Sequence, residues 1–105
     1  MNYEIFIMKD CDKCHHIVHR LTEKGANFTQ YDLTGGVRDE RIKGKKLLAS
    51  YMQPLGLEKV DGLVDIPVLL AYDGEKPVDL SATKKDGKLT VLQGKAAVEG
   101  IDALL

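Results

Sequence analysis

The residues best suited to chemistry lie near the start of the chain, in the stretch MKDCDKCHH over residues 8–16. It contains both cysteines of the chain, Cys11 and Cys14, with His15 and His16 directly behind them. Four chemistries use such spacing: electron transfer by a dithiol, zinc binding by Cys and His, attachment of a c-type haem, and binding of an iron–sulfur cluster. The composition and the predicted elements decide among them.

The composition favours one compact domain over residues 1–105, since 44% of the residues are apolar. A net charge of −1 and the absence of Trp argue against nucleic-acid and anionic-membrane partners. No apolar run approaches the roughly 18 residues of a membrane span. The first ten residues, MNYEIFIMKD, also lack the features of a secretory signal. We therefore expect a cytoplasmic protein, in which a purely structural disulfide is improbable and a catalytic or metal role for the cysteines is favoured.

A strand followed by a helix is expected to position the two cysteines. Residues 3–8 form a short apolar run that predicts a buried strand. The pattern then becomes helical and predicts a helix over 11–24, with Asp10 as its N-cap and Gly25 as its stop. The apolar face of this helix holds Cys14, Ile17, Val18 and Leu21.

The remaining elements predict a mixed sheet flanked by helices. The order β-α-β-α-β-β-α implies a right-handed parallel crossover early in the chain and an antiparallel strand pair late in it. Residues 55–64 show no clear pattern, and the polar segment 75–87 suggests a loop or a short hairpin. The further predicted elements are a strand at 26–33, a helix from 37 to about 52 ended by Pro54 and Gly56, strands at 64–72 and 88–94, and a weak helix at 96–105.

This order, with Cys-x-x-Cys at the first strand-to-helix junction, resembles the thioredoxin-like superfamily, and most of all the glutaredoxins and small redoxins. The likeness is carried by IFIMKDCDKC (5–14), YDL (31–33), Asp65-Ile66-Pro67, and the segment 99–102, EGID. Asp12-Lys13 stands where the family usually has Pro-Tyr, and Glu99 replaces the first Gly of a Gly-Gly pair.

The resemblance implies a thioredoxin-like, glutaredoxin-type α/β fold with a four-stranded mixed sheet. It implies that the Ile66–Pro67 bond is cis and lies beside the cysteines, where the backbone of Ile66 pairs with a bound substrate. It also implies that residues 99–102 form a turn opening the final helix, where Asp102 contacts glutathione. A basic residue, Arg38 or Arg41, is expected to contact glutathione as well.

The dithiol chemistry has a clear mechanism in this setting. A helix N-terminus favours a thiolate, so Cys11 is expected to be the exposed nucleophile, and Cys14, in the apolar stripe, the buried resolving thiol. Lys9 adds positive charge beside the thiolate, whereas Asp10 and Asp12 oppose it by like-charge repulsion.

The other chemistries find less support in the residues. The pattern Cys-x-x-Cys-His matches a haem site, but haem attachment follows export and suits helical cytochromes rather than a β-rich chain. Zinc needs about four ligands, whereas His15, His16 and His19 fall off the apolar stripe and are expected to face solvent. An iron–sulfur cluster would need a dimer or glutathione to supply further thiolates. A non-catalytic domain that binds a partner also remains open.

The sequence thus predicts a thiol–disulfide oxidoreductase that reduces protein disulfides or glutathione mixed disulfides. No bound metal or cofactor is expected, and glutathione is a candidate co-substrate. The expected partners are disulfide-containing proteins and an electron donor, either glutathione or a thioredoxin-reductase-type enzyme. The predicted catalytic residues are Cys11 and Cys14, and the predicted substrate-binding residues are Lys9, Ile66, Pro67 and Asp102.

Overall fold

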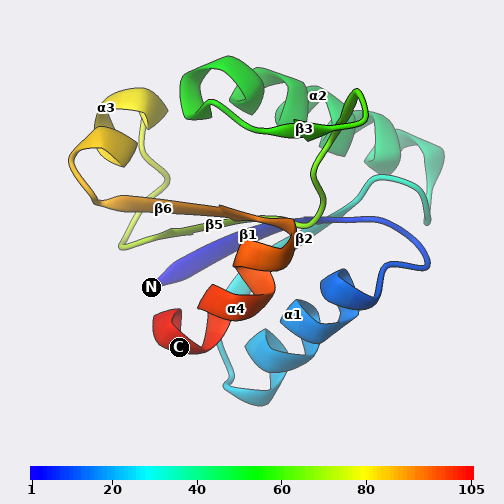
Figure 1. Cartoon of the computed structure of the whole chain (residues 1–105), viewed down its shortest axis with the longest axis horizontal. Coiled ribbons are helices and arrows are strands. Elements are labelled where there is room, and N and C mark those ends of the chain that lie inside the picture. The colour runs from blue at the N-terminus through cyan, green and yellow to red at the C-terminus, as the bar shows by residue number, and fades with distance from the viewer.

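The computed structural model describes all 105 residues and has a four-stranded mixed sheet with helices on both faces (Figure 1). The strands lie in the order β2-β1-β5-β6; β1 pairs with β2 in parallel, and the other two pairs are antiparallel. The predicted α/β class and mixed four-stranded sheet are therefore confirmed. The elements in chain order are β1 (Asn2–Ile7), α1 (Asp12–Glu23), β2 (Asn27–Asp32), α2 (Arg38–Leu55), β3 (Lys59–Val60), β4 (Leu63–Val64), β5 (Val68–Tyr72), α3 (Leu80–Lys85), β6 (Leu89–Gln93) and α4 (Gly94–Leu104).

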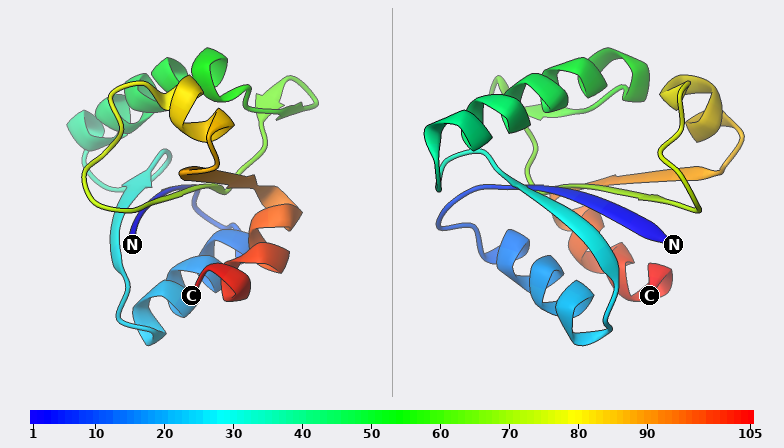
Figure 2. Two further views of the ribbon diagram at one scale, coloured as in Figure 1. Left: turned by 90° about the vertical axis from the view of Figure 1, so that its left-hand side faces the viewer. Right: turned by 180° about the vertical axis from the view of Figure 1, so that it is seen from behind.

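The sheet separates two helical layers, with α1 and α4 on one face and α2 and α3 on the other (Figure 2). Alternate side chains of β1 enter the two cores because successive residues of a strand point to opposite faces. Ile5 packs with Cys14 against α1, whereas Phe6 stacks on Tyr31 and meets the edge of Tyr51 on the side of α2. No helix of the structure is long and apolar enough to cross a bilayer.

Residues 55–64, for which the sequence shows no clear pattern, contain a small β-hairpin formed by β3 and β4. Its turn is Asp61-Gly62, and both residues have positive φ angles, 52° and 82°. A two-residue turn of this kind requires positive φ at both positions, which Asp and Gly tolerate best. The predicted strand 64–72 is shorter in the structure. Val64 belongs to β4, and β5 begins only after Pro67, which has no N–H to donate to a sheet.

Two helical segments also differ from the prediction. Helix α2 continues through Pro54 to Leu55, because Tyr51 and Leu55 are buried against the sheet, and it ends at Gly56 in the left-handed conformation. The segment 75–87, predicted as a loop or hairpin, contains helix α3. The Asp79 carboxylate caps this helix by accepting the backbone N–H of Ala82 at 3.0 Å. The predicted element order therefore lacked β3, β4 and α3.

A buried carboxylate fastens the sheet to α2. Glu4 of β1 is only 3% exposed, and it accepts hydrogen bonds from the hydroxyls of Tyr51 at 2.7 Å and Tyr72 at 2.9 Å. Lys76 approaches the same carboxylate at 3.6 Å and lies 4.6 Å from the centre of the Tyr51 ring. The buried charge thus has hydrogen-bond donors and a cation around it, as burial of a carboxylate requires.

This cluster predicts how the protein responds to alkali. Burial, reinforced by the hydrogen bond to Glu4, raises the pKa of Tyr72 to about 12 and also raises the pKa of Tyr51. An unfolded tyrosine titrates near pH 10, so the unfolded chain loses these protons first. The contribution of the Tyr72 hydroxyl to stability is therefore complete below about pH 10 and is lost as the pH rises through about 12, whereas that of the Tyr51 hydroxyl is lost only at still higher pH.

In a titration with alkali, we expect the ultraviolet absorbance of phenolate to rise over the same pH range in which the circular-dichroism spectrum of the folded protein is lost. Phenolate from all the tyrosines near pH 10, with the folded spectrum intact, would contradict this account of Tyr51 and Tyr72.

Candidate redox site at the start of α1

The two cysteines form a disulfide at the N-terminus of α1, with their Cα atoms 5.2 Å apart. Cys11 is the N-cap of the helix, and its Sγ accepts the backbone N–H of Cys14 at 3.2 Å. The Cys11 carbonyl accepts the first helical hydrogen bond, from the N–H of His15 at 3.1 Å. The prediction of Asp10 as N-cap is wrong by one residue, because Asp10 has a left-handed φ of 58° and turns the chain just before the helix.

The two sulfurs differ in access. Cys14 is fully buried in the core with Ile5, Ile17 and Leu21, whereas Cys11 is only partly buried at its edge. This difference in exposure follows the prediction from the helical periodicity. The three histidines, His15, His16 and His19, are exposed on α1 as expected.

The loop that carries Cys11 is tied to the end of β2. The backbone N–H of Lys9 donates to Thr34 Oγ1 at 2.6 Å. Asp32 in turn accepts the N–H groups of Thr34 at 3.0 Å and Gly35 at 2.8 Å, and the bond from Thr34 contributes most to lowering the pKa of Asp32. Asp32 and Thr34 were not predicted as part of the site, although an Asp two residues before Thr34-Gly35-Gly36 is a signal for a side-chain-capped turn.

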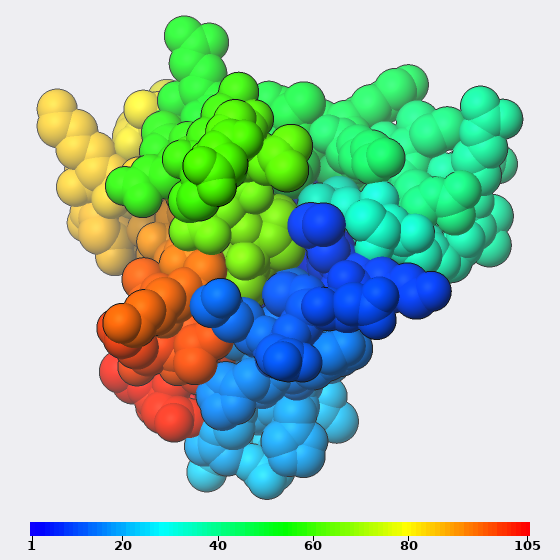
Figure 3. Space-filling model, turned by 45° about the vertical axis from the view of Figure 1, so that its right-hand side comes forward, coloured from blue at the N-terminus to red at the C-terminus, as the bar shows by residue number.

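A groove of about 430 Å³ lies beside Cys11, between the loop after β1 and the β3–β4 hairpin. Figure 3 shows this side of the molecule, where the green hairpin stands above the blue segment that carries the cysteines. The groove is lined by Met8, Lys9, Asp10, Cys11, Asp12, Lys13, Val60, Leu63, Val64, Asp65 and Ile66.

Ile66 lies in the wall of the groove, and the next residue, Pro67, is buried behind that wall. The Ile66–Pro67 bond is cis, as the resemblance implies, and Pro67 is buried. The backbone N–H and C=O of Ile66 take part in none of the backbone–backbone hydrogen bonds of the chain. Ile66 and the exposed Lys9 therefore both remain available beside Cys11.

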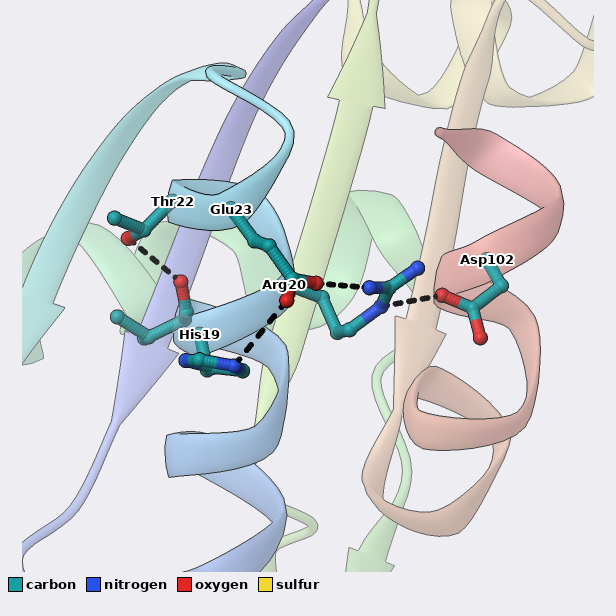
Figure 4. Close-up of polar contacts among 6 residues, drawn as sticks. His19, Arg20, Thr22, Glu23 and Asp102 are labelled. Carbon is teal, nitrogen blue, oxygen red and sulfur yellow. Dashed lines mark hydrogen bonds and ion pairs between the residues drawn. The ribbon is translucent and has the colours of Figure 1, made fainter.

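Asp102 does not line the groove beside Cys11. Residues 99–102 lie within α4 and do not form a turn opening it, so the expected placement is wrong. The Asp102 carboxylate accepts the Nε–H of Arg20 at 2.8 Å, and Arg20 also contacts Glu23 (Figure 4). Arg20 lies nine residues after Cys11, roughly 13 Å along the helix, so this ion pair joins α4 to the far end of α1.

The two candidate arginines lie at the beginning of α2. Arg38 is exposed, and Arg41 donates to the carbonyl of Gly36 at 2.6 Å. Neither lines the groove beside Cys11.

The final helix begins instead at Gly94, which packs directly against the site. Gly94 has a φ of 55°, and its N–H donates to the carbonyl of Pro67 at 2.9 Å. A Cβ at this position would lie 2.5 Å from a carboxylate oxygen of Asp65. The segment that borders the groove and the start of α4 therefore fit together only because residue 94 has no side chain.

Gly94→Ala is expected to lower the free energy of unfolding by about 1–3 kcal/mol, since it combines a left-handed backbone with crowding of Asp65. Gly25→Ala is a matched control, because Gly25 has a similar φ of 64° and open space around it. Urea unfolding should show a larger loss for Gly94→Ala than for Gly25→Ala. Equal losses would mean that contact with Asp65 contributes nothing.

Other hollows and clusters offer less chemistry. The largest hollow, about 720 Å³, lies between the end of α2 and α3, and its polar lining consists of Gln53, Asp79 and Ser81, with no cysteine or histidine. The structure gathers no group of three or more His, Cys, Asp or Glu side chains placed to hold a metal ion.

The fold and the site together define a small α/β protein with a Cys-x-x-Cys disulfide at a helix N-terminus. Comparison with models of known families, with curated proteins and with solved structures finds no match for this chain.

Proposed function

We propose that this protein is a thiol–disulfide oxidoreductase of the thioredoxin-like, glutaredoxin-related type. The observation that carries the proposal is the Cys11–Cys14 disulfide at the N-terminus of α1, with one sulfur accessible and the other buried. The strand order and the cis Ile66–Pro67 bond beside the groove support the relationship to that fold. A cytoplasmic location belongs to the same proposal, because disulfides in cytosolic proteins are usually catalytic or redox-sensing, which is the role proposed for this Cys-x-x-Cys pair.

The reaction begins with the reduced form of the protein. The Cys11 thiolate attacks one sulfur of a substrate disulfide, forms a mixed disulfide and releases the other substrate sulfur as a thiolate, which takes up a proton. Cys14 then loses its proton and attacks Cys11 Sγ, which restores the Cys11–Cys14 disulfide and releases the second substrate thiol. The protein dithiol is oxidised by two electrons, and the substrate disulfide is reduced to two thiols.

The surroundings of Cys11 support its role as the nucleophile. Its Sγ receives the N–H of Cys14 at 3.2 Å, and the partial positive charge at the start of α1 favours a thiolate there. Lys9 also contributes positive charge to the same groove, while Asp10 and Asp12 oppose it.

The groove supports binding of an extended substrate segment. The unpaired N–H and C=O of Ile66 suit pairing with substrate backbone, in the manner of a strand added to a sheet edge. Pro67, buried behind Ile66, fixes the direction of the chain at that point. Lys9 is proposed to contact the substrate from the opposite wall.

A thiol donor must return the protein to its reduced form after each turnover. Glutathione or a thioredoxin-reductase-type enzyme would supply the two electrons, with no cofactor held by the chain itself. Because Asp102 is engaged by Arg20, we do not assign it to glutathione.

The proposal is tested by turnover on a model protein disulfide, with the two donor systems run in parallel. One assay contains thioredoxin reductase, and the other contains glutathione with its reductase. We expect disulfide reduction that depends on the protein in at least one of them. Failure in both, with protein that is folded and has reduced cysteines, would contradict the proposed function.

A further inference from the structure

We propose that the β3–β4 hairpin selects substrates by forming the apolar wall of the groove beside Cys11. The occupant is an extended segment of a disulfide-bearing protein that carries a large apolar side chain next to its reacting cysteine. This inference rests on the proposed function and adds to it the class of substrate.

The distribution of exposed apolar side chains over the molecule supports this wall as a binding surface. Seven large hydrophobic residues are exposed, and three of them, Met8, Val60 and Leu63, line this one groove. Val60 and Leu63, on the two strands of the hairpin, are 56% and 72% exposed. Apolar side chains gathered around a reactive group are typical of a binding surface, whereas single exposed ones need no explanation.

The hairpin is held firmly enough to act as a wall. The side-chain amide of Gln93 in β6 accepts the N–H of Glu58 at 2.7 Å and donates to the carbonyls of Glu58 and Asp65, both at 3.1 Å. The N–H of Asp65 closes the base of the hairpin by donating to the Glu58 carbonyl at 3.0 Å. A wall that is already ordered loses less conformational entropy when a substrate binds.

The charges of the groove favour a protein segment over glutathione. Lys9 and Lys13 line it together with three carboxylates, those of Asp10, Asp12 and Asp65. Glutathione carries two carboxylates, and the groove offers them no excess of positive charge. An apolar side chain placed against Val60 and Leu63 gains from burial instead, while the substrate backbone pairs with Ile66.

The test uses two short peptide disulfides that differ only in the residue beside the cysteine, Leu in one and Ser in the other. Hydroxyethyl disulfide, which has no flanking residue, reports the basal chemistry. We expect the wild-type protein to reduce the Leu peptide with a kcat/KM roughly tenfold or more above that of the Ser peptide.

Two substitutions remove the wall, Val60→Ser and Leu63→Ser, and both residues are exposed enough to leave the core unchanged. They should abolish the preference for the Leu peptide, measured as the ratio of its kcat/KM to that of the Ser peptide in the same variant. Gln93→Ala, which frees the hairpin, should reduce the preference in the same direction. Val78→Ser is the matched control, because Val78 is fully exposed and lies outside the groove.

A preference that persists in both hairpin variants overturns the inference, as does equal wild-type activity on the two peptides. The proposed function fails separately, if the wild-type protein reduces none of the three disulfides.

Discussion

Cys11→Ser is expected to reduce turnover of protein disulfides to below roughly 1% of the wild-type rate. The serine hydroxyl has nearly the shape of the thiol but cannot form the mixed disulfide on which the reaction depends. Cys14 cannot substitute for it, because Cys14 is fully buried behind the first turn of α1. The measurement is the turnover assay, with circular dichroism to show that the variant is folded.

Cys14→Ser is expected to fail at the second step and to accumulate as a mixed disulfide between Cys11 and the substrate. Non-reducing mass spectrometry should find the adduct on the peptide that contains Cys11. His16→Ala is the control, since His16 is exposed on the same helix and has no assigned role. Full activity in Cys11→Ser would contradict the assignment of the nucleophile, and so would the absence of any mixed disulfide when Cys14→Ser is mixed with the substrate.

Glu4→Leu is expected to lower the free energy of unfolding by about 2–4 kcal/mol. The substitution leaves the hydroxyls of Tyr51 and Tyr72 without their acceptor, and these residues are only 2% and 8% exposed. Lys76 is 39% exposed and can turn to solvent, so it adds little to the cost. Replacing Glu4 also removes the cost of keeping a charged carboxylate away from water. This gain offsets part of the lost stability and keeps the expected effect within this range.

Glu4→Gln should cost less than Glu4→Leu, since the amide oxygen still accepts one of the two hydroxyls. Tyr72→Phe combined with Glu4→Leu should cost less than the sum of the single changes, because the two residues share a hydrogen bond. Urea unfolding measures both effects. Additive losses, or a Glu4→Leu effect below about 0.5 kcal/mol, would show that the buried cluster does not stabilise the fold.

Local patterns predicted the part of the site that depends on local structure. The helix after Cys11, the burial of Cys14 and the greater exposure of Cys11 all follow from a 3.6-residue period, which the structure keeps. The strands β1 and β5 follow from short apolar runs.

Some of the missed elements had signals of their own. Asp61-Gly62 is a strong hairpin signal, but the strands that it joins have two residues each, too few to show an alternating pattern. Helix α3 is preceded by a capping Asp79, yet it contains no buried residue, so no apolar face marks it.

Long-range contacts account for the rest. Asp102 is held by Arg20, which lies 82 residues earlier in the chain, and nothing near Asp102 in the sequence reports that pairing. Likewise, Glu4 looks like a surface charge within an apolar strand until Tyr51 and Tyr72 supply its hydrogen-bond donors. Whether a charged side chain such as Glu4 is buried or paired depends on residues distant in the sequence, which a local pattern does not show.

A single turnover followed by mass spectrometry tests the dithiol chemistry of Cys11 and Cys14 most directly. Reduced protein is mixed without oxygen with an equal amount of a protein disulfide, and the remaining thiols are alkylated. We expect one Cys11–Cys14 disulfide for each substrate disulfide reduced, with no other product at completion. Cysteines that remain alkylated in full while the substrate stays oxidised would contradict it.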